Sequence, residues 1–448
     1  MLPVRAIMPS APPAMAFAHA SSPSHPVGSL LAVGAALPAD RVPAGRGRRC
    51  AARPDEDGIT LAAQAGAEAL DQADLPATLV LATTTPPYDE GGSVQVLAEL
   101  LRLTPATCAV ELTATARDGL SALRVALALA QAQRAPVLLC ASHAGSRETE
   151  QDGDGAVALL LGPPADTALA TLTMGPSHVE ELRDRWRLRR DPEMREGDSS
   201  FVDEYGATRL ATDLGRAACA QGDAPVAVCA PSGRAATKAE RALGGAGDEI
   251  APRTGLLGTA HPLLRLVCGL DAPQIVLAVA AGMGESVRVA PAPAAAEVSQ
   301  RMRDRAAGGS ERDAPLPIPS GAGFDPYASG PRAWRERGQD LRLEGIRYGD
   351  RLVYPPPAAP PPDRRDEPPV IQSLAREGTV LTHTRDHVYP GGDVTGMVVL
   401  ELDDGARFYS QVAMGEELGI GDRAQLIPRR LHQGGGVVQY FWKAAPCR

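Results

Sequence analysis

The run Gly155-Ala156-Val157-Ala158-Leu159-Leu160-Leu161 has seven consecutive residues without a charged side chain. A short apolar run of this kind is typical of a strand buried on both faces of a parallel sheet. Similar runs occur on either side of it, at 79–82, 136–140, 224–229 and 274–280. This part of the chain therefore predicts several buried strands.

Helix patterns separate these runs. Asp57 is a suitable helix N-cap, and the apolar residues after it predict a helix through 61–70. The segment 120–133 is apolar on nearly every side, which predicts a helix buried in the middle of the fold. Because strands and helices alternate, we predict an α/β domain with helices packed on the sheet.

Proline marks the domain boundaries. Of the 41 prolines, 15 lie between Pro291 and Pro369, where we expect neither a continuous helix nor a central strand. The segment 1–26 lacks the continuous apolar core of a secretory signal and predicts a disordered leader. We therefore divide the chain into this leader, an α/β domain (27–290), a Pro-rich linker (291–370) and a second domain (371–448).

The second domain has a different pattern. Strand-like segments occur at 378–384, 396–402, 406–412, 424–428 and 437–442, with glycine-containing turns between several of them. Five short strands of this kind predict a small β-barrel such as an OB-fold.

Composition excludes several classes of protein. The 448 residues carry a net charge of -9, which argues against nucleic-acid and anionic-membrane partners. No apolar stretch approaches the roughly 20 residues that a membrane-spanning helix needs. The seven cysteines are widely spaced and contain no CxxC pattern, which argues against a disulfide scaffold and favours a cytoplasmic location.

Four segments carry a resemblance to a known family. They are Val27 through Pro38, Pro54-Asp55-Glu56-Asp57, Gly153 through Ala158 and Ala230-Pro231-Ser232-Gly233-Arg234. Their order resembles the thiolase superfamily, specifically 3-hydroxy-3-methylglutaryl-CoA (HMG-CoA) synthase of the archaeal and bacterial type. The resemblance implies an α/β/α/β/α layered fold made of two related βαβ halves.

The tail, 371–445, resembles the OB-fold domain that accompanies acyl-CoA enzymes of this superfamily. In that family a zinc ribbon precedes the barrel, and Gly345 through Pro356 resembles a remnant of it. No cysteine lies between Cys268 and Cys447, so the four thiolate ligands are missing. We therefore expect no zinc there.

The resemblance also assigns the family's four active-site positions. In place of its nucleophilic cysteine, oxyanion-hole histidine, asparagine and acid/base glutamate, this sequence has Ala116, Cys229, Leu256 and Thr84 respectively. A methyl group cannot attack a thioester, leucine has no polar group, and a threonine hydroxyl is a poor proton carrier near neutral pH. The pattern predicts a retained scaffold that has lost its condensing chemistry.

Several alternatives stay open at this stage. Cys229 is either a small buried residue or a relocated nucleophile. His261 is the imidazole near the Leu256 segment, and Asp89 or Glu90 is a possible replacement for the glutamate. Cys108 is expected to be a core residue.

The resemblance implies a non-catalytic acyl-CoA-binding or scaffold subunit of a thiolase-type acyltransferase complex, partnered as a homodimer, with a catalytic thiolase, or both. Arg234 and Lys238 are candidates to meet the phosphates of coenzyme A, against the alternative that they lie on a solvated helix face. No covalently bound cofactor is expected. The other possibilities are an active acyltransferase or HMG-CoA synthase-like enzyme with atypical residues, and a structural dimer with a closed pocket.

Overall fold

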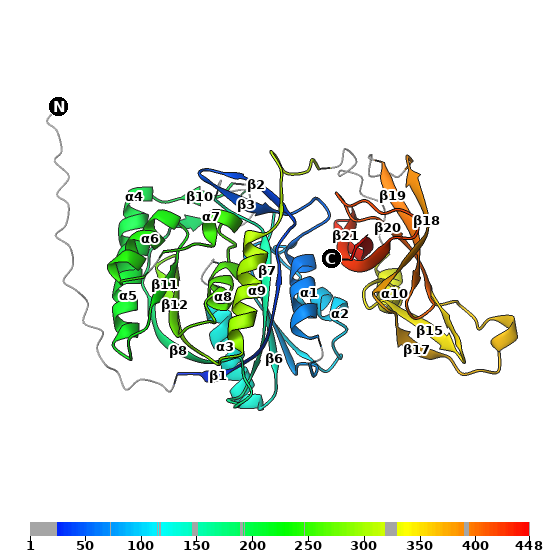
Figure 1. Cartoon of the computed structure of the whole chain (residues 1–448), viewed down its shortest axis with the longest axis horizontal. Helices are drawn as coiled ribbons and strands as arrows, with labels where there is room; N and C mark the ends of the chain where they lie inside the picture. The colour runs from blue at the N-terminus through cyan, green and yellow to red at the C-terminus, as the bar shows by residue number, and fades with distance from the viewer. Residues whose placement is uncertain are drawn as a thin grey trace.

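The computed structural model of the chain describes residues 25–71, 73–113, 115, 118–145, 151–188, 191, 193–245, 247–318, 329–388 and 394–447. The predicted leader lies outside the described residues except for His25 and Pro26. The first domain is built on a nine-stranded sheet of order β11-β12-β13-β8-β1-β7-β6-β4-β5 (Figure 1). The strands are β1 (Val27–Ala36), β4 (Thr78–Thr83), β5 (Cys108–Leu112), β6 (Val137–His143), β7 (Gly155–Gly162), β8 (Ala170–Val179), β11 (Val226–Cys229), β12 (Gln274–Ala280) and β13 (Met283–Pro291).

The sheet is mixed. β4 runs parallel to β5 and β6, and β11 runs parallel to β12, whereas the other pairs are antiparallel. The apolar run from Gly155 forms β7 as predicted, but its expected parallel pairing is wrong, because β7 is antiparallel to both β1 and β6. Every residue of β7 is buried. The apolar run therefore indicated burial and not strand direction.

Helices lie in three layers. They are α1 (Gly58–Ala69) and α2 (Val94–Leu100); α3 (Asp118–Gln133), α8 (Ala260–Cys268) and α9 (Ala295–Ala307); and α5 (Leu210–Cys219) and α6 (Gly233–Ala242). The α3 helix contacts β1, β4, β6, β7 and β13, and α8 contacts β6, β7, β11 and β12. The two helices thus lie between the halves of the sheet, as predicted for 120–133. Asp57 caps α1 by accepting from the amides of Ile59 and Thr60, as predicted.

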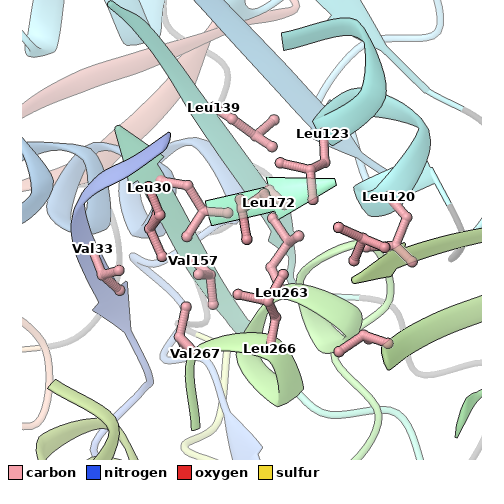
Figure 2. Close-up of a cluster of buried hydrophobic side chains, with 14 of the residues drawn as sticks. Leu30, Val33, Leu120, Leu123, Leu139, Val157, Leu172, Leu263, Leu266 and Val267 are labelled. Carbon is pink, nitrogen blue, oxygen red and sulfur yellow. The ribbon is translucent and has the colours of Figure 1, made fainter. Parts of the chain in front are cut away.

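The central core is made of aliphatic side chains. Figure 2 shows leucines and valines from β1, α3, β6, β7, β8 and α8 pointing toward one another. Leu120, Leu123, Leu263 and Leu266 have no exposed surface. Full burial of one such side chain contributes about 1.5–3 kcal/mol, so this layer holds the two halves together.

The Pro-rich segment contains helices, contrary to the prediction. The α9 helix packs against α8, with Ala295 and Met302 in the central core, and α10 (Gly330–Asp340) follows later. Prolines precede α9 at 291 and 293, but none lies within it. Pro331 lies in the first turn of α10, where its missing amide costs no helical hydrogen bond. The prolines therefore lie before these helices or in their first turn, where they do not prevent a helix from forming.

The second domain contains the five predicted strands. They are β18 (Glu377–Asp386), β19 (Thr395–Leu402), β20 (Arg407–Gln411), β21 (Arg423–Gly434) and β22 (Val437–Pro446). They form one antiparallel sheet of order β20-β19-β18-β21-β22, and a parallel bridge between Val412 and Ala444 joins its outer strands. Before it, β15 (Glu344–Tyr348), β16 (Arg351–Val353) and β17 (Val370–Ser373) form a separate antiparallel sheet.

Smaller elements complete the described chain. They are β2 (Asp40–Ala44), β3 (Gly47–Ala51), β14 (Ser310–Glu311), β9 (Arg185–Trp186), β10 (Arg195–Glu196), α4 (Ser199–Phe201), the π-helical segment η1 (Val202–Arg209), α7 (Ala251–Thr254) and the 3-10 turn η2 (Pro362–Arg364). Among the described residues no helix is long and apolar enough to cross a membrane.

The five-stranded sheet lies beside α1 (Figure 1). Buried ion pairs join it to the first domain. Lys443 Nζ lies 3.1 Å from an oxygen of Asp55, and Arg429 lies 2.8 Å from Glu56. Arg53, which precedes α1, pairs with Glu416. These side chains are nearly all buried, so the two domains share one polar interface that water does not screen.

Candidate functional site

A cavity of about 760 Å³ lies where the parallel strands of both halves end. Its lining includes Thr84 after β4, His143 at the end of β6, Cys229 at the end of β11 and Ala280 at the end of β12. The carboxyl ends of parallel strands form a crevice that is the usual ligand site of α/β sheets. This cavity is therefore the candidate functional site.

Three of the four predicted active-site positions meet in this cavity. Thr84, Cys229 and Leu256 all line it, although they lie far apart in the sequence. Ala116 lies outside the described residues, but Thr115, just before it, also lines the cavity.

Cys229 has the environment of a structural thiol. It is 5% exposed, and burial raises its pKa well above the ordinary value, while the nearby guanidinium of Arg265 opposes the shift without cancelling it. The thiolate is the reactive form of cysteine, so a thiol held protonated at neutral pH is a poor nucleophile.

His143 also lines the cavity, and it was not predicted from the sequence. Its Nδ1 lies 2.5 Å from Oγ1 of Thr84. Burial lowers the pKa of His143, with Asp152 opposing and Arg185 reinforcing the shift, so the imidazole is neutral near pH 7. Its Nε2 is buried and has no hydrogen-bond partner among the described residues.

Strand register explains why these two side chains meet. Thr83 of β4 pairs with Ser142 of β6 in the parallel ladder, so the next residues along the two strands, Thr84 and His143, lie side by side at this end of the sheet. The sequence signal was a polar residue within three positions of the end of each of two apolar runs: Thr84 after 79–82 and His143 after 136–140. The contact between Thr84 and His143 follows only once the strands formed by these two runs, β4 and β6, are known to be neighbours.

Gly258 leaves the space that the pair occupies. Its φ is +49°, and a Cβ built on it would lie 2.5 Å from His143 Nδ1 and 2.8 Å from Thr84 Oγ1. Any side chain at 258 would collide with the pair in addition to straining the backbone. The contact between Thr84 and His143 therefore depends on a glycine from a distant loop.

His261 also lines the cavity, as part of a buried ionic group. Its Nε2 lies 2.9 Å from Asp248, and Arg265 lies 3.7 Å from the same carboxylate and 3.0 Å from Glu240. Burial acts to raise the pKa of Asp248, but His261 and Arg265 outweigh it and hold that pKa below the ordinary range. The carboxylate fixes the ring, which favours a positioning role for Asp248.

The predicted phosphate-binding residues lie elsewhere. Arg234 and Lys238 are on α6 and pair at 2.5 Å with Asp203 and Glu204 of η1. Neither is among the cavity-lining residues. Of the two predicted glutamate replacements, Asp89 lines the cavity and Glu90 does not.

The second domain forms part of the cavity wall. Arg430, Gln433 and Val438 of the β21–β22 hairpin line the cavity, together with Arg185 and Arg187 of the first domain. The amide of Val438 donates to the hydroxyl of Tyr88 at 2.8 Å, which fastens the hairpin to the loop after β4. Guanidinium groups of both domains thus face one cavity.

Two further expectations concern cysteine and metals. Cys108 is exposed, contrary to the core placement expected for it, because β5 is the edge strand of the sheet. Among the described residues no group of three or more His, Cys, Asp or Glu side chains is placed to hold a metal ion.

Comparisons with known proteins place the fold. No family model matches the chain. Part of it is 36% identical over 165 residues to a 3-oxopimeloyl-[acyl-carrier-protein] synthase of Rhodothermus marinus, with 30% of this chain and 48% of that protein covered. The chain thus spans about half the length of the curated relative it matches.

Solved structures resemble about three fifths of the chain. A curacin-pathway HMG synthase, solved in complex with a holo donor acyl carrier protein, matches with a TM-score of 0.54 and 15% identity, covering 63% of this chain and 86% of that one. A 3-oxoacyl-(acyl carrier protein) synthase III of Pseudomonas aeruginosa matches with a TM-score of 0.51 and 19% identity, covering 60% and 98%. The fold is therefore thiolase-like, and the relatives are condensing enzymes.

Proposed function

We propose that this chain is a non-condensing member of the thiolase-like proteins that binds acyl thioesters and works beside a catalytic thiolase. The observation that carries the proposal is the cavity itself. Three of the four positions that the family resemblance assigns to the active site line it, and these positions have a protonated Cys229, an apolar Leu256 and a hydroxyl at Thr84. Without a thiolate nucleophile, Claisen condensation has no acyl carrier.

Binding remains feasible because the cavity is large and mixed in character. Small and apolar groups such as Ala278 and Val438 alternate with the guanidinium groups of Arg185, Arg187 and Arg430. An acyl-pantetheine chain needs an apolar channel, and its phosphates need cations at the entrance. Arg234 and Lys238 fit this role less well, because neither lines the cavity.

The second domain fits the OB-fold reading. Its strand order and the parallel bridge between Val412 and Ala444, which brings β20 and β22 together, support the proposal of a five-stranded OB barrel. We propose that it serves as a wall of the thioester cavity and not as a nucleic-acid module, since it contributes Arg430, Gln433 and Val438 to that cavity. The sheet β15–β17 occupies the place of the expected degenerate ribbon, and we propose that it holds no zinc.

A partner surface is offered by β5, the edge strand at one end of the nine-stranded sheet. Cys108 and Ala109 are exposed on it, and no described strand pairs with its outer edge, so this edge can pair with another strand. We propose that this edge joins two copies of the chain or one copy and a catalytic thiolase. The seven cysteines are all free thiols, and we extend the proposal to a cytoplasmic location.

The test combines binding with product analysis. Acetyl-CoA should raise the melting temperature of the full chain, and Val438→Trp should abolish the shift by filling the cavity mouth. Val437→Trp is the matched control, because Val437 is exposed and does not line the cavity. Intact mass after incubation should reveal no cysteine-bound acyl group, and no acetoacetyl-CoA or HMG-CoA should form.

The second candidate is an active condensing enzyme that uses Cys229. Its location at the end of β11 inside the cavity favours it. A stoichiometric acyl adduct that disappears in Cys229→Ala, together with a carbon–carbon bonded product, would establish this candidate and overturn the proposal.

A further inference from the structure

The contact between Thr84 and His143 is not used by the proposed function. Loss of carbon–carbon bond formation does not remove other thioester chemistry, and a hydroxyl within hydrogen-bond distance of a neutral imidazole is the arrangement of an activated oxygen nucleophile. Both residues line the cavity, and Thr84 is half-buried, so its hydroxyl lies at the boundary between the protein and the cavity.

We propose that this cavity hydrolyses acyl thioesters, with Thr84 Oγ1 as the nucleophile and His143 as the general base. The inference rests on the proposed function for its substrate class, the thioester of a phosphopantetheine thiol. Coenzyme A and acyl carrier protein both carry that thiol, so the chemistry is shared between two sources.

The first half-reaction transfers the acyl group to threonine. Thr84 Oγ1 forms a bond to the thioester carbonyl carbon as its proton passes to Nδ1 of His143. The carbon–sulfur bond then breaks, and the thiolate leaves with the proton from His143. Thr115 Oγ1 is buried, lines the same cavity and has no hydrogen-bond partner among the described residues, so it supplies a hydroxyl donor for the oxyanion.

The second half-reaction regenerates the protein. His143 takes a proton from water, the water oxygen bonds to the acyl carbon, and the bond from that carbon to Thr84 Oγ1 breaks. His143 returns the proton to Thr84. One thioester and one water give one carboxylic acid and one thiol, with no oxidation or reduction.

The surroundings support this use of His143. A base must be neutral in the resting state, and burial keeps the imidazole neutral near pH 7. Asp152 favours the imidazolium that forms during the reaction, while Arg185, 3.9 Å from Asp152, opposes it. The missing side chain at Gly258 keeps the two reacting groups at 2.5 Å.

The test measures thiol release by the full chain from acetyl-CoA, from hexanoyl-CoA and from the same acyl groups on acyl carrier protein. The ratio of the rates identifies the source of the thiol. Thr84→Val and His143→Asn should each lower the rate about 10²- to 10⁴-fold, whereas Thr84→Ser should retain turnover. Thr382→Val is the matched control, because Thr382 is an exposed residue of β18 outside the cavity.

Two readouts separate a reacting pair from a structural one. The rate should rise with pH as His143 loses its proton, with a midpoint below the ordinary histidine value of about 6.5, and His143→Asn should remove that dependence. A trapped acyl group should map to the peptide containing Thr84 and resist neutral hydroxylamine, which cleaves thioesters but spares oxygen esters.

The outcomes also separate this inference from the proposed function. Two results would overturn the hydrolase and leave the binding function intact. In the first, the thioester binds but its thiol is released no faster than in buffer. In the second, Thr84→Val leaves the rate of thiol release unchanged. A hydroxylamine-sensitive adduct on Cys229 with a condensed product would overturn the non-condensing function instead.

Discussion

Lys443 Nζ lies 3.1 Å from Asp55 Oδ2, and each side chain is 2% exposed. The lysine belongs to the last strand of the second domain, and the aspartate lies two residues before the helix cap of α1. Burial lowers the pKa of Lys443, while Asp55 opposes the shift. Two domains that are distant in the sequence thus meet through a charge pair that water cannot reach.

Lys443→Met should therefore destabilise the whole chain. It removes the nearer of the two cations beside the buried carboxylate of Asp55 and leaves only Arg429, at 3.9 Å. Loss of one partner of a buried pair costs about 3–5 kcal/mol. Denaturant unfolding monitored by tryptophan fluorescence measures the loss. Arg423→Met, which breaks an exposed pair with Asp403, is the control and should have a much smaller effect. Equal losses in the two variants would contradict the role given to the interface.

Gly258→Ala should perturb the cavity more than an ordinary glycine substitution does. The new Cβ would collide with His143 and Thr84, whereas Gly45→Ala, at φ +56°, adds a Cβ with nothing within 4 Å. Both variants carry the cost of a left-handed residue, about 1–3 kcal/mol, so the difference between their melting temperatures isolates the collision. Similar melting temperatures for the two variants would mean that His143 and Thr84 can move away from the new Cβ.

Cysteine labelling should follow burial. In the native chain at pH 8, iodoacetamide is expected to modify Cys108 and Cys447, which are exposed. It should not modify Cys229, because burial keeps that thiol protonated. Peptide mass spectrometry identifies the modified sites, and labelling in guanidinium supplies the reference in which all seven react. Rapid native modification of Cys229 would instead favour the condensing-enzyme alternative.

Asp154 should make stability fall as pH rises. Burial raises its pKa from 3.8 to about 6, although the amides of Ala52 and Gly145 donate to the charged form. Because the folded chain holds this proton more tightly than the unfolded chain, the favourable contribution is complete below pH 4 and is lost between about pH 4 and 6. Two pKa units correspond to about 3 kcal/mol.

The measurement compares unfolding free energies of the wild type and Asp154→Asn from pH 4 to pH 7. Other titrating groups cancel in the difference, so the wild type should lose stability relative to the variant across this range. A constant difference would mean that the pKa of Asp154 is ordinary.

Burial patterns were the part of the fold that could be predicted from the sequence. The apolar run at β7, the cap at Asp57 and the buried helix α3 follow from local composition, because a side chain's hydrophobicity reports how deeply it lies. Strand direction at β7 and the exposed edge position of Cys108 depend on which strands become neighbours. Pairing is a property of the whole sheet, so no local pattern contains it.

The candidate site was predicted in part for the same reason. Thr84, Cys229 and Leu256 came from family resemblance, and they line one cavity. His143 was missed because its partner is set by the register of β4 against β6. The α9 helix was missed because proline density was averaged over a long segment, although 295–307 itself contains none.

Asp57 lies at the meeting point of three parts of the molecule. Its carboxylate caps α1, accepts a hydrogen bond from the hydroxyl of Tyr440 at 2.8 Å, and lines the cavity. One side chain thus takes part in the start of α1, in the contact with the five-stranded sheet and in the cavity wall. Replacing the five-stranded sheet would therefore remove a hydrogen bond from the residue that begins α1, so the start of this helix and the seating of the sheet are coupled.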